Sequence, residues 1–268
     1  ILDGPRGSTT DVWDRRAAVD LTKLPGPPSL REALAEGWAD HPRRAVERFG
    51  GRHLAHCAMA SPFCAIYAHL GFAGMMEAMR GDPELLEAIT ENRLAHSRVT
   101  LEVCAEAGVE CVFVEETLSS ADLISEADYL RFSYPTTAGL LQYARDLGIR
   151  MVYYYCGAIE RRLEHIASLP ADALAFEESK KSFEIDLATV RETLGPQRPL
   201  LGNIDAVLLR DAGAATIRRA VEEQFAAAGP LLATSAGSPL TLDTCPATLD
   251  AMVESARLIR PLESVRRD

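Results

Sequence analysis

From about residue 50 onward, short apolar runs rich in β-branched and aromatic residues alternate with longer segments whose apolar residues recur at helical spacing. The expected strands are His53–Ala58, Cys111–Glu115, Arg150–Tyr155, Ala173–Glu177, Leu200–Ile204 and Leu231–Thr234. The expected helices are Pro83–Ala107, Glu126–Leu147, Ala158–Leu169, Ile185–Leu194, Ala214–Ala228 and Pro246–Leu258. Repeated alternation of strand and helix along one chain predicts a parallel sheet covered by helices.

The stretch before residue 50 is rich in Pro, Gly and charge, so we expect an irregular segment at 1–50. The composition does not change after that point, which favours a single domain at 51–268. We predict an α/β fold, a (β/α)8-type TIM barrel, because the alternation already supplies most of its units. The strands still missing would lie in the irregular segment or in a part of the protein before Ile1.

The composition narrows the range of partners. The chain has 268 residues, 47% of them hydrophobic, which is enough for a sizeable core. A formal net charge of −11 disfavours binding to the phosphate backbone of nucleic acid and favours a small-molecule substrate. The sequence shows no apolar run of the ~20 residues that cross a bilayer and no signal-peptide pattern, so we expect a cytoplasmic protein without a membrane partner.

The candidate functional residues follow the strand ends, because the carboxyl ends of all strands in a parallel barrel open onto one face, the mouth. The candidates for catalysis are Tyr154, Cys156, Glu116, Glu178 and Lys180, and those for substrate binding are His56, Asn203, Asp205 and Ser235. Carboxylates facing a lysine can hold shifted pKa values and act as acid and base. A thiol followed by glycine, as at Cys156–Gly157, lets a ligand approach closely.

Each candidate also has a purely structural interpretation. The carboxylates could be solvated loop charges, and Cys156 could be a small core residue. Asn203 and Asp205 could hydrogen-bond their own backbone in a turn. A single histidine such as His56 is more often structural than a base. The residues by themselves leave these alternatives open.

Several segments, in order along residues ~50 to 260, resemble the uroporphyrinogen decarboxylase superfamily, which includes the methylcobamide:coenzyme M methyltransferases. Gly202–Asp205 followed by Val207–Leu209 resembles its "GNIDP…LL" segment, and Tyr155–Gly157 resembles its "H-x-C-G" strand end. Similar matches are Ser125–Phe132 to "sPemYreF", Ala236–Pro246 to "GCGIPPDTPPEN", and Ser61–Tyr67 to "aPwTLxxY". The resemblance implies a barrel, a homodimer, and Tyr67 as a substrate contact.

The chain departs from the family pattern at the metal positions. The methyltransferase branch holds zinc with the His and Cys of "HxCG" and the Cys of "GCG", whereas Tyr154 and Ala236 stand at two of these positions here. One remaining thiolate cannot supply the usual three protein ligands of catalytic zinc. Zinc is therefore disfavoured, and a rearranged site would have to use Cys156, Glu178 and Cys245.

The decarboxylase branch is matched no better. Its Arg-rich segment and strand-end Asp would lie before residue 50, and the His of its "GHG" corresponds to Ala236. A binding site for an acidic tetrapyrrole is expected to carry arginine, whereas the mouth predicted here is acidic. Decarboxylation of uroporphyrinogen itself is therefore disfavoured.

Three hypotheses remain. The sequence favours the first, which is methyl transfer involving a small molecule or a corrinoid, with a corrinoid as co-substrate or a corrinoid protein as partner. The second is a metal-free decarboxylase or lyase acting on a small acid. The third is a ligand-binding barrel that has lost its chemistry, since a fold does not determine a function.

Overall fold

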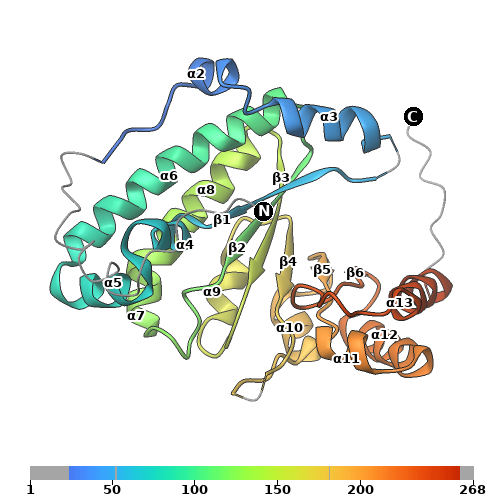
Figure 1. Ribbon diagram of the computed structural model, residues 1–268. Coiled ribbons are helices and arrows are strands. Elements are labelled where there is room, and N and C mark those ends of the chain that lie inside the picture. Colours follow the sequence, from blue (N-terminus) through green and yellow to red (C-terminus); the bar gives the residue numbers. More distant parts are fainter. Residues whose placement is uncertain (1–23, 52, 181, 260–268) are drawn as a thin grey trace. The chain divides into compact units, whose positions relative to one another are not determined.

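The computed structural model describes residues 24–51, 53–180 and 182–259 (Figure 1). Its helices and strands alternate, and every paired strand for which a register is defined runs parallel to its neighbour. The contacts between residues separate the chain into two compact units. Among the described residues, the amino-terminal unit comprises those up to 119 together with 123–151, and the carboxyl-terminal unit comprises 120–122 and those from 152 onward.

The amino-terminal unit is mainly helical. Its elements are α2 (Leu30–Ala35), α3 (Asp40–Phe49), β1 (His56–Ala60), α4 (Pro62–Ala65), α5 (Tyr67–Gly81), α6 (Pro83–Glu106), β2 (Cys111–Glu116), α7 (Glu126–Asp128), a π-helical turn (Tyr129–Ser133) and α8 (Tyr134–Asp146). Strands β1 and β2 pair in parallel, and α6 lies beside α8 (Figure 1). The backbone N–H of Arg150 donates to the carbonyl of Glu110, so β3 starts next to β2.

The helices of this unit begin where the sequence offers caps. The hydroxyl of Ser29 accepts from the backbone of Glu32, whose carboxylate accepts from the Ser29 backbone in return, which is a capping box. The carboxylate of Asp82 accepts from the Leu85 N–H and is followed by Pro83, which suits the first helical position because it has no N–H to leave unpaired. Ser61 caps α4 in the same manner.

The carboxyl-terminal unit carries the remaining strands. Its elements are β3 (Arg150–Tyr155, from Val152), α9 (Leu163–Ser168), β4 (Ala173–Phe176), α10 (Leu187–Leu194), β5 (Leu200–Leu201), α11 (Ala206–Asp211), α12 (Ala214–Ala228), β6 (Leu232–Ala233) and α13 (Pro246–Ile259). Strands β3 to β6 pair in chain order. Helices α12 and α13 lie side by side over a core of Ile204, Leu209, Ile217 and Val221 (Figure 1).

The predicted parallel α/β class is confirmed, and the structure adds elements that the hydrophobic pattern did not reveal. Helices α4, α5 and α11 were not predicted, because the first two contain few polar residues to mark a face and the third is short. The stretch expected to be irregular contains α2 and α3, while its first 23 residues lie outside the described part. Among the described helices, none is both long enough and apolar enough to cross a membrane.

Candidate active site

The strands of the carboxyl-terminal unit are followed by polar residues at one edge, because β3 to β6 all run in the same direction. These residues are Cys156, Glu177, Glu178, Asn203 and Ser235–Ser238. An isolated parallel bridge between Ile204 and Ala236 keeps the ends of β5 and β6 together. The edge is therefore a defined surface on which side chains from separate strands meet.

Four of these side chains form what we call the carboxylate–lysine cluster: Glu177, Glu178, Lys180 and Ser238. The side chain of Glu178 is 4% exposed, and Lys180 Nζ donates to its Oε1 while Ser238 Oγ donates to its Oε2 at 2.7 Å. Lys180 Nζ also lies 3.3 Å from Glu177 Oε1 and 3.2 Å from Ser238 Oγ. Two carboxylates thus share one ammonium group.

Gly237 and Tyr154 hold the loop after β6 against Glu178. A Cβ atom at Gly237 would lie 2.5 Å from both the backbone N and Oε2 of Glu178, so only glycine fits there. The Tyr154 hydroxyl donates to the Gly237 carbonyl. The tyrosine at the family's histidine position is therefore engaged in fixing this loop.

Glu177 is held from two sides. Its Oε2 accepts from the Gly157 N–H at 2.9 Å, and its backbone carbonyl accepts from Asn203 Nδ2 at 3.0 Å. Asn203 Oδ1 in turn accepts from Gln224 Nε2 of α12 at 3.0 Å. Asn203 thus uses its amide to join β5, the loop after β4, and α12.

The surroundings shift the pKa of Lys180 in this cluster and the pKa of the neighbouring Tyr154. Partial burial lowers the pKa of Lys180, but its contacts with Glu178 and Glu177 outweigh that effect and raise the pKa overall, so Lys180 is positively charged at neutral pH. Burial raises the pKa of Tyr154 far above its usual range, with further contributions from the adjacent Cys156 and the charges of Glu177 and Glu178. Tyr154 is consequently a hydrogen-bond donor and not a base near neutral pH.

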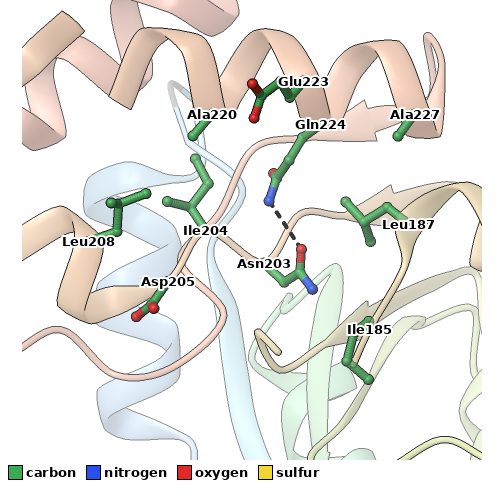
Figure 2. Close-up of a pocket in the computed structure, with 10 residues that line it drawn as sticks. All are labelled: Ile185, Leu187, Asn203, Ile204, Asp205, Leu208, Ala220, Glu223, Gln224 and Ala227. Atoms are coloured by element: carbon green, nitrogen blue, oxygen red, sulfur yellow. Dashed lines mark hydrogen bonds between the residues drawn. The ribbon is translucent and has the colours of Figure 1, made fainter. Parts of the chain in front are cut away.

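A groove of about 290 Å³ opens beside Asn203 (Figure 2). Its walls are Ile185, Leu187, Ile204, Leu208, Ala220 and Ala227, and its polar residues are Asn203, Asp205, Glu223 and Gln224. Figure 2 shows Gln224 pointing from α12 toward Asn203, and the dashed line between them is the amide hydrogen bond. Asn203 lines the groove and also donates to the backbone carbonyl of Glu177, so it connects the groove with the carboxylate–lysine cluster.

A second polar cluster, in the amino-terminal unit, surrounds Glu116 at the end of β2. Its carboxylate is fully buried and accepts from the hydroxyls of Ser61 and Ser133, at 2.7 and 2.8 Å. The thiol of Cys64 donates to it at 2.9 Å, and the Leu118 N–H at 3.1 Å. Burial and the charge of Glu116 raise the pKa of Cys64, so that thiol stays protonated.

The other predicted site residues lie apart from these clusters. β1 begins at His56, so the imidazole stands at the amino end of the strand, against Phe113, and not at the mouth as expected from the strand range His53–Ala58. Tyr67 is 56% exposed at the start of α5, and Cys245 is exposed before α13. Ser235 donates to the Ala236 carbonyl, and Asp205 caps α11 through the Val207 N–H.

The donor set does not fit the zinc site of the methyltransferase branch. Within the described residues, no group of three His, Cys, Asp or Glu side chains is arranged to hold a metal ion. The hydroxyl of Tyr154 binds the Gly237 carbonyl, and Ala236 has no donor atom in its side chain. Catalytic zinc needs about three protein ligands, so we derive no reaction step through zinc.

Several residues that the structure brings into these sites are not among the predicted site residues, and Ser133, Gln224 and Ser61 are examples. Ser133 and Gln224 sit inside helical segments, where a polar residue normally faces water, so nothing marked them. Ser61 could have been found, because a serine before proline at the end of a strand is a helix cap that stands at the mouth.

Comparison with known proteins gives a consistent result. The family model described as uroporphyrinogen decarboxylase (URO-D) matches residues 14–258. A uroporphyrinogen decarboxylase of Arthrobacter sp. (strain FB24) is 30% identical over 264 residues, which cover 97% of this chain and 72% of the relative. Another from Salinispora tropica is 30% identical over 131 residues, covering 49% of this chain and 33% of the relative.

Solved structures with a similar fold include two enzymes. A methyltransferase from Methanosarcina mazei matches with a TM-score of 0.75 at 18% identity, over 88% of this chain and 70% of that one. A putative vitamin-B12 independent methionine synthase from Listeria monocytogenes matches with a TM-score of 0.55 at 16% identity, over 83% and 69%. At these identities the likeness shows a shared fold alone.

Proposed function

Because the chain belongs to the uroporphyrinogen decarboxylase family, we propose that it is a lyase of the decarboxylase type that acts on a small carboxylic acid. The observation that carries this proposal is the carboxylate–lysine cluster, in which Lys180 forms an ion pair with the buried Glu178. The names of the curated relatives support the same reaction class. The proposal requires only acid–base chemistry by residues of this chain.

Lys180 supplies the positive charge in the proposed reaction. The substrate carboxylate loses CO2 when its C–C bond breaks, and the electron pair stays on the substrate carbon. The ammonium of Lys180 stabilises that negative charge and donates a proton to the carbon, which is far more basic than an amine. The side chain of Lys180 is 40% exposed and its pKa is raised, so the amine then regains a proton from water.

Glu178 and Ser238 act as positioning residues for Lys180. Glu178 is almost fully buried, and its two oxygens bind Lys180 Nζ and Ser238 Oγ. Ser238 also receives a hydrogen bond from Lys180 at 3.2 Å. These contacts fix where the ammonium group points, which is the main requirement for effective proton donation.

The charge of the cluster limits the substrate. Glu177 and Glu178 together outweigh the one charge of Lys180, so a molecule with many carboxylates would be repelled. We therefore propose a substrate with a single carboxylate near the reacting carbon, in place of the acidic tetrapyrrole that the relatives' name implies.

The test measures release of labelled CO2 by mass spectrometry from carboxyl-labelled small acids, such as pyrrole-2-carboxylate and acetoacetate, with uroporphyrinogen as a comparison. We expect Lys180→Met to slow release from the active acid about 100-fold or more, the usual contribution of a positioned proton donor. Glu178→Gln should slow it less, and the exposed Glu192→Gln on α10 is the matched control. The proposal fails if no acid loses CO2, or if a folded Lys180→Met enzyme keeps the parent rate.

Methyl transfer is the second candidate, favoured by the half-buried Cys156 thiol that follows β3 beside Tyr154. The fold shared with the methyltransferase from Methanosarcina mazei is compatible with it. The test mixes the protein with methylcobalamin and 2-mercaptoethanol and follows the corrinoid spectrum. Demethylation that disappears in Cys156→Ser would establish this function over the first.

A further inference from the structure

The groove beside Asn203 differs from the carboxylate–lysine cluster in being mostly apolar, and we propose that it binds a small organic cation with an apolar body, such as an alkylammonium ion (Figure 2). This inference does not depend on the proposed function, because the groove is defined by its own walls and charges. Its volume of about 290 Å³ is at the lower end of the range for ligand sites, which fits a short chain.

The apolar side chains that line the groove account for the apolar body of the proposed ligand. Ile185 and Leu187 line the groove at the start of α10, and their side chains reach it from the side opposite Leu208 in Figure 2. Ala220 and Ala227 line it from α12, and their short side chains leave space between the helix and the strand end. Burying a short alkyl chain there gains roughly 25 cal/mol for each Å² removed from water.

The ionisable residues of the groove account for the positive charge of the proposed ligand. The charged side chains that line the groove are Asp205 and Glu223, and no Lys or Arg is among the described lining residues. Arg210 binds both oxygens of Asp211 at 2.6 Å, and its charge also acts on Asp205, although it does not line the groove. Arg219 lies 3.5 Å from Glu223, but both side chains are over 70% exposed, so water screens this pair.

The polar floor of the groove is held in place before a ligand arrives. Asn203 is 8% exposed and its amide is fixed by Gln224 Nε2 on one side and by the Glu177 carbonyl on the other. Gly202 gives Gln224 the room it needs, because a Cβ atom there would overlap the Gln224 amide. A ligand that displaced Asn203 would also displace the backbone of Glu177 through this hydrogen bond. Binding in the groove would then change the position of Glu177 in the carboxylate–lysine cluster.

The experiment is a calorimetric titration at pH 7 and low salt with three probes that share one alkyl chain: hexylammonium, 1-hexanol and hexanoate. We expect hexylammonium to bind about tenfold more tightly than hexanol, and hexanoate to bind more weakly than either, because two carboxylates attract the cation and repel the anion. High salt should reduce the difference between the probes.

Four variants locate the binding. Asp205→Asn keeps the cap of α11, and Glu223→Gln keeps the shape of α12. Each variant should reduce the ratio of the hexylammonium affinity to the hexanol affinity by a few-fold. Ala220→Phe should abolish binding by filling the groove, with Ala227→Leu as a milder alternative if the first variant does not fold. Glu222→Gln, exposed on the same helix but outside the groove, is the matched control and should bind as the parent does.

The inference is overturned by any of three results: no binding of hexylammonium at millimolar concentration, equal affinity for hexylammonium and hexanol, or unchanged binding in folded groove-filling variants. None of these results bears on CO2 release, so failure here leaves the proposed function standing.

Discussion

Glu116 shows how much the surroundings of one residue decide its role. The sequence identified it as a candidate acid or base, and in the structure its carboxylate is fully buried with Ser61, Ser133 and Cys64 as side-chain donors. A carboxylate whose oxygens are already occupied holds its neighbours in position. We therefore propose a positioning role for Glu116 in the amino-terminal unit.

Replacing Glu116 tests this role. Glu116→Leu leaves two hydroxyls and a thiol without their acceptor, and buried polar groups without partners cost about 1–3 kcal/mol each, so we expect a loss of roughly 3 kcal/mol in the free energy of unfolding. Glu116→Gln keeps an acceptor oxygen and should lose about half as much. Urea unfolding measures both, with the exposed neighbour Glu115→Gln as the matched control. Equal stability of all variants would contradict the positioning role.

At the scale of elements, the segment Glu126–Leu147 was predicted as one helix and is continuous but not uniform. Residues Glu126–Asp128 are α-helical, Tyr129–Ser133 form a π-helical turn, and α8 runs to Asp146. Pro135 has no N–H to donate to the preceding turn, which accounts for a local change in the hydrogen-bond ladder. The turn ends at Ser133, whose hydroxyl reaches Glu116.

An ion pair ties α7 to α5 and predicts a pH dependence. Arg80 donates to both oxygens of Asp128 at 2.7 Å, and this hydrogen bonding holds the pKa of Asp128 at about 2, below the 3.8 of a free aspartate. A lowered carboxyl pKa stabilises the fold fully above pH ~3.8, and this contribution is lost as the pH falls from there through 2. The side chain of Arg80 is 67% exposed, so the contribution is on the order of 1 kcal/mol.

The measurement compares the unfolding free energy of the parent and Arg80→Gln between pH 2 and pH 6. The difference should be present at pH 6 and shrink toward pH 2, whereas the exposed Arg43→Gln should show little difference at any pH. If the difference in unfolding free energy between the parent and Arg80→Gln does not change with pH, the Arg80–Asp128 pair is not the source of the pH dependence.

The loop after β3 depends on a glycine at a definite position. Gly157 has a φ of +91°, and a Cβ atom there would lie 2.5 Å from the Cβ of Ser120. Gly157→Ala should therefore destabilise the protein by about 1–3 kcal/mol in thermal or urea unfolding. Gly139→Ala in α8, where a Cβ would meet Leu94 at 3.7 Å and Arg98 at 4.0 Å, both ordinary contact distances, should instead stabilise by about 0.5–1 kcal/mol. This explanation is wrong if the two substitutions change the free energy of unfolding in the same direction.

At the scale of the whole molecule, the predicted fold class and the family are both confirmed, by the match to residues 14–258 and by the fold shared with the methyltransferase from Methanosarcina mazei. The small-molecule function expected from the net charge of −11 stays a prediction. The homodimer, the cytoplasmic location and a corrinoid partner stay predictions. Family membership does not determine the reaction, which is why the proposals rest on the clusters of this chain.

The sequence by itself determined the parallel α/β class, because strand and helix periodicities differ and are set by local residue order. It also placed Tyr154 and Ala236 at positions where the resembled family carries zinc ligands, whatever the fold does with them. Only the tertiary structure decided which polar residues meet: Glu178 with Lys180 and Ser238, Asn203 with Gln224, and Glu116 with Ser133. Glu178 and Lys180 are neighbours in the chain, but the other contacts join residues 17, 21 and 60 positions apart. Burial and hydrogen bonding, which decide the roles of all these residues, exist only once the chain has folded.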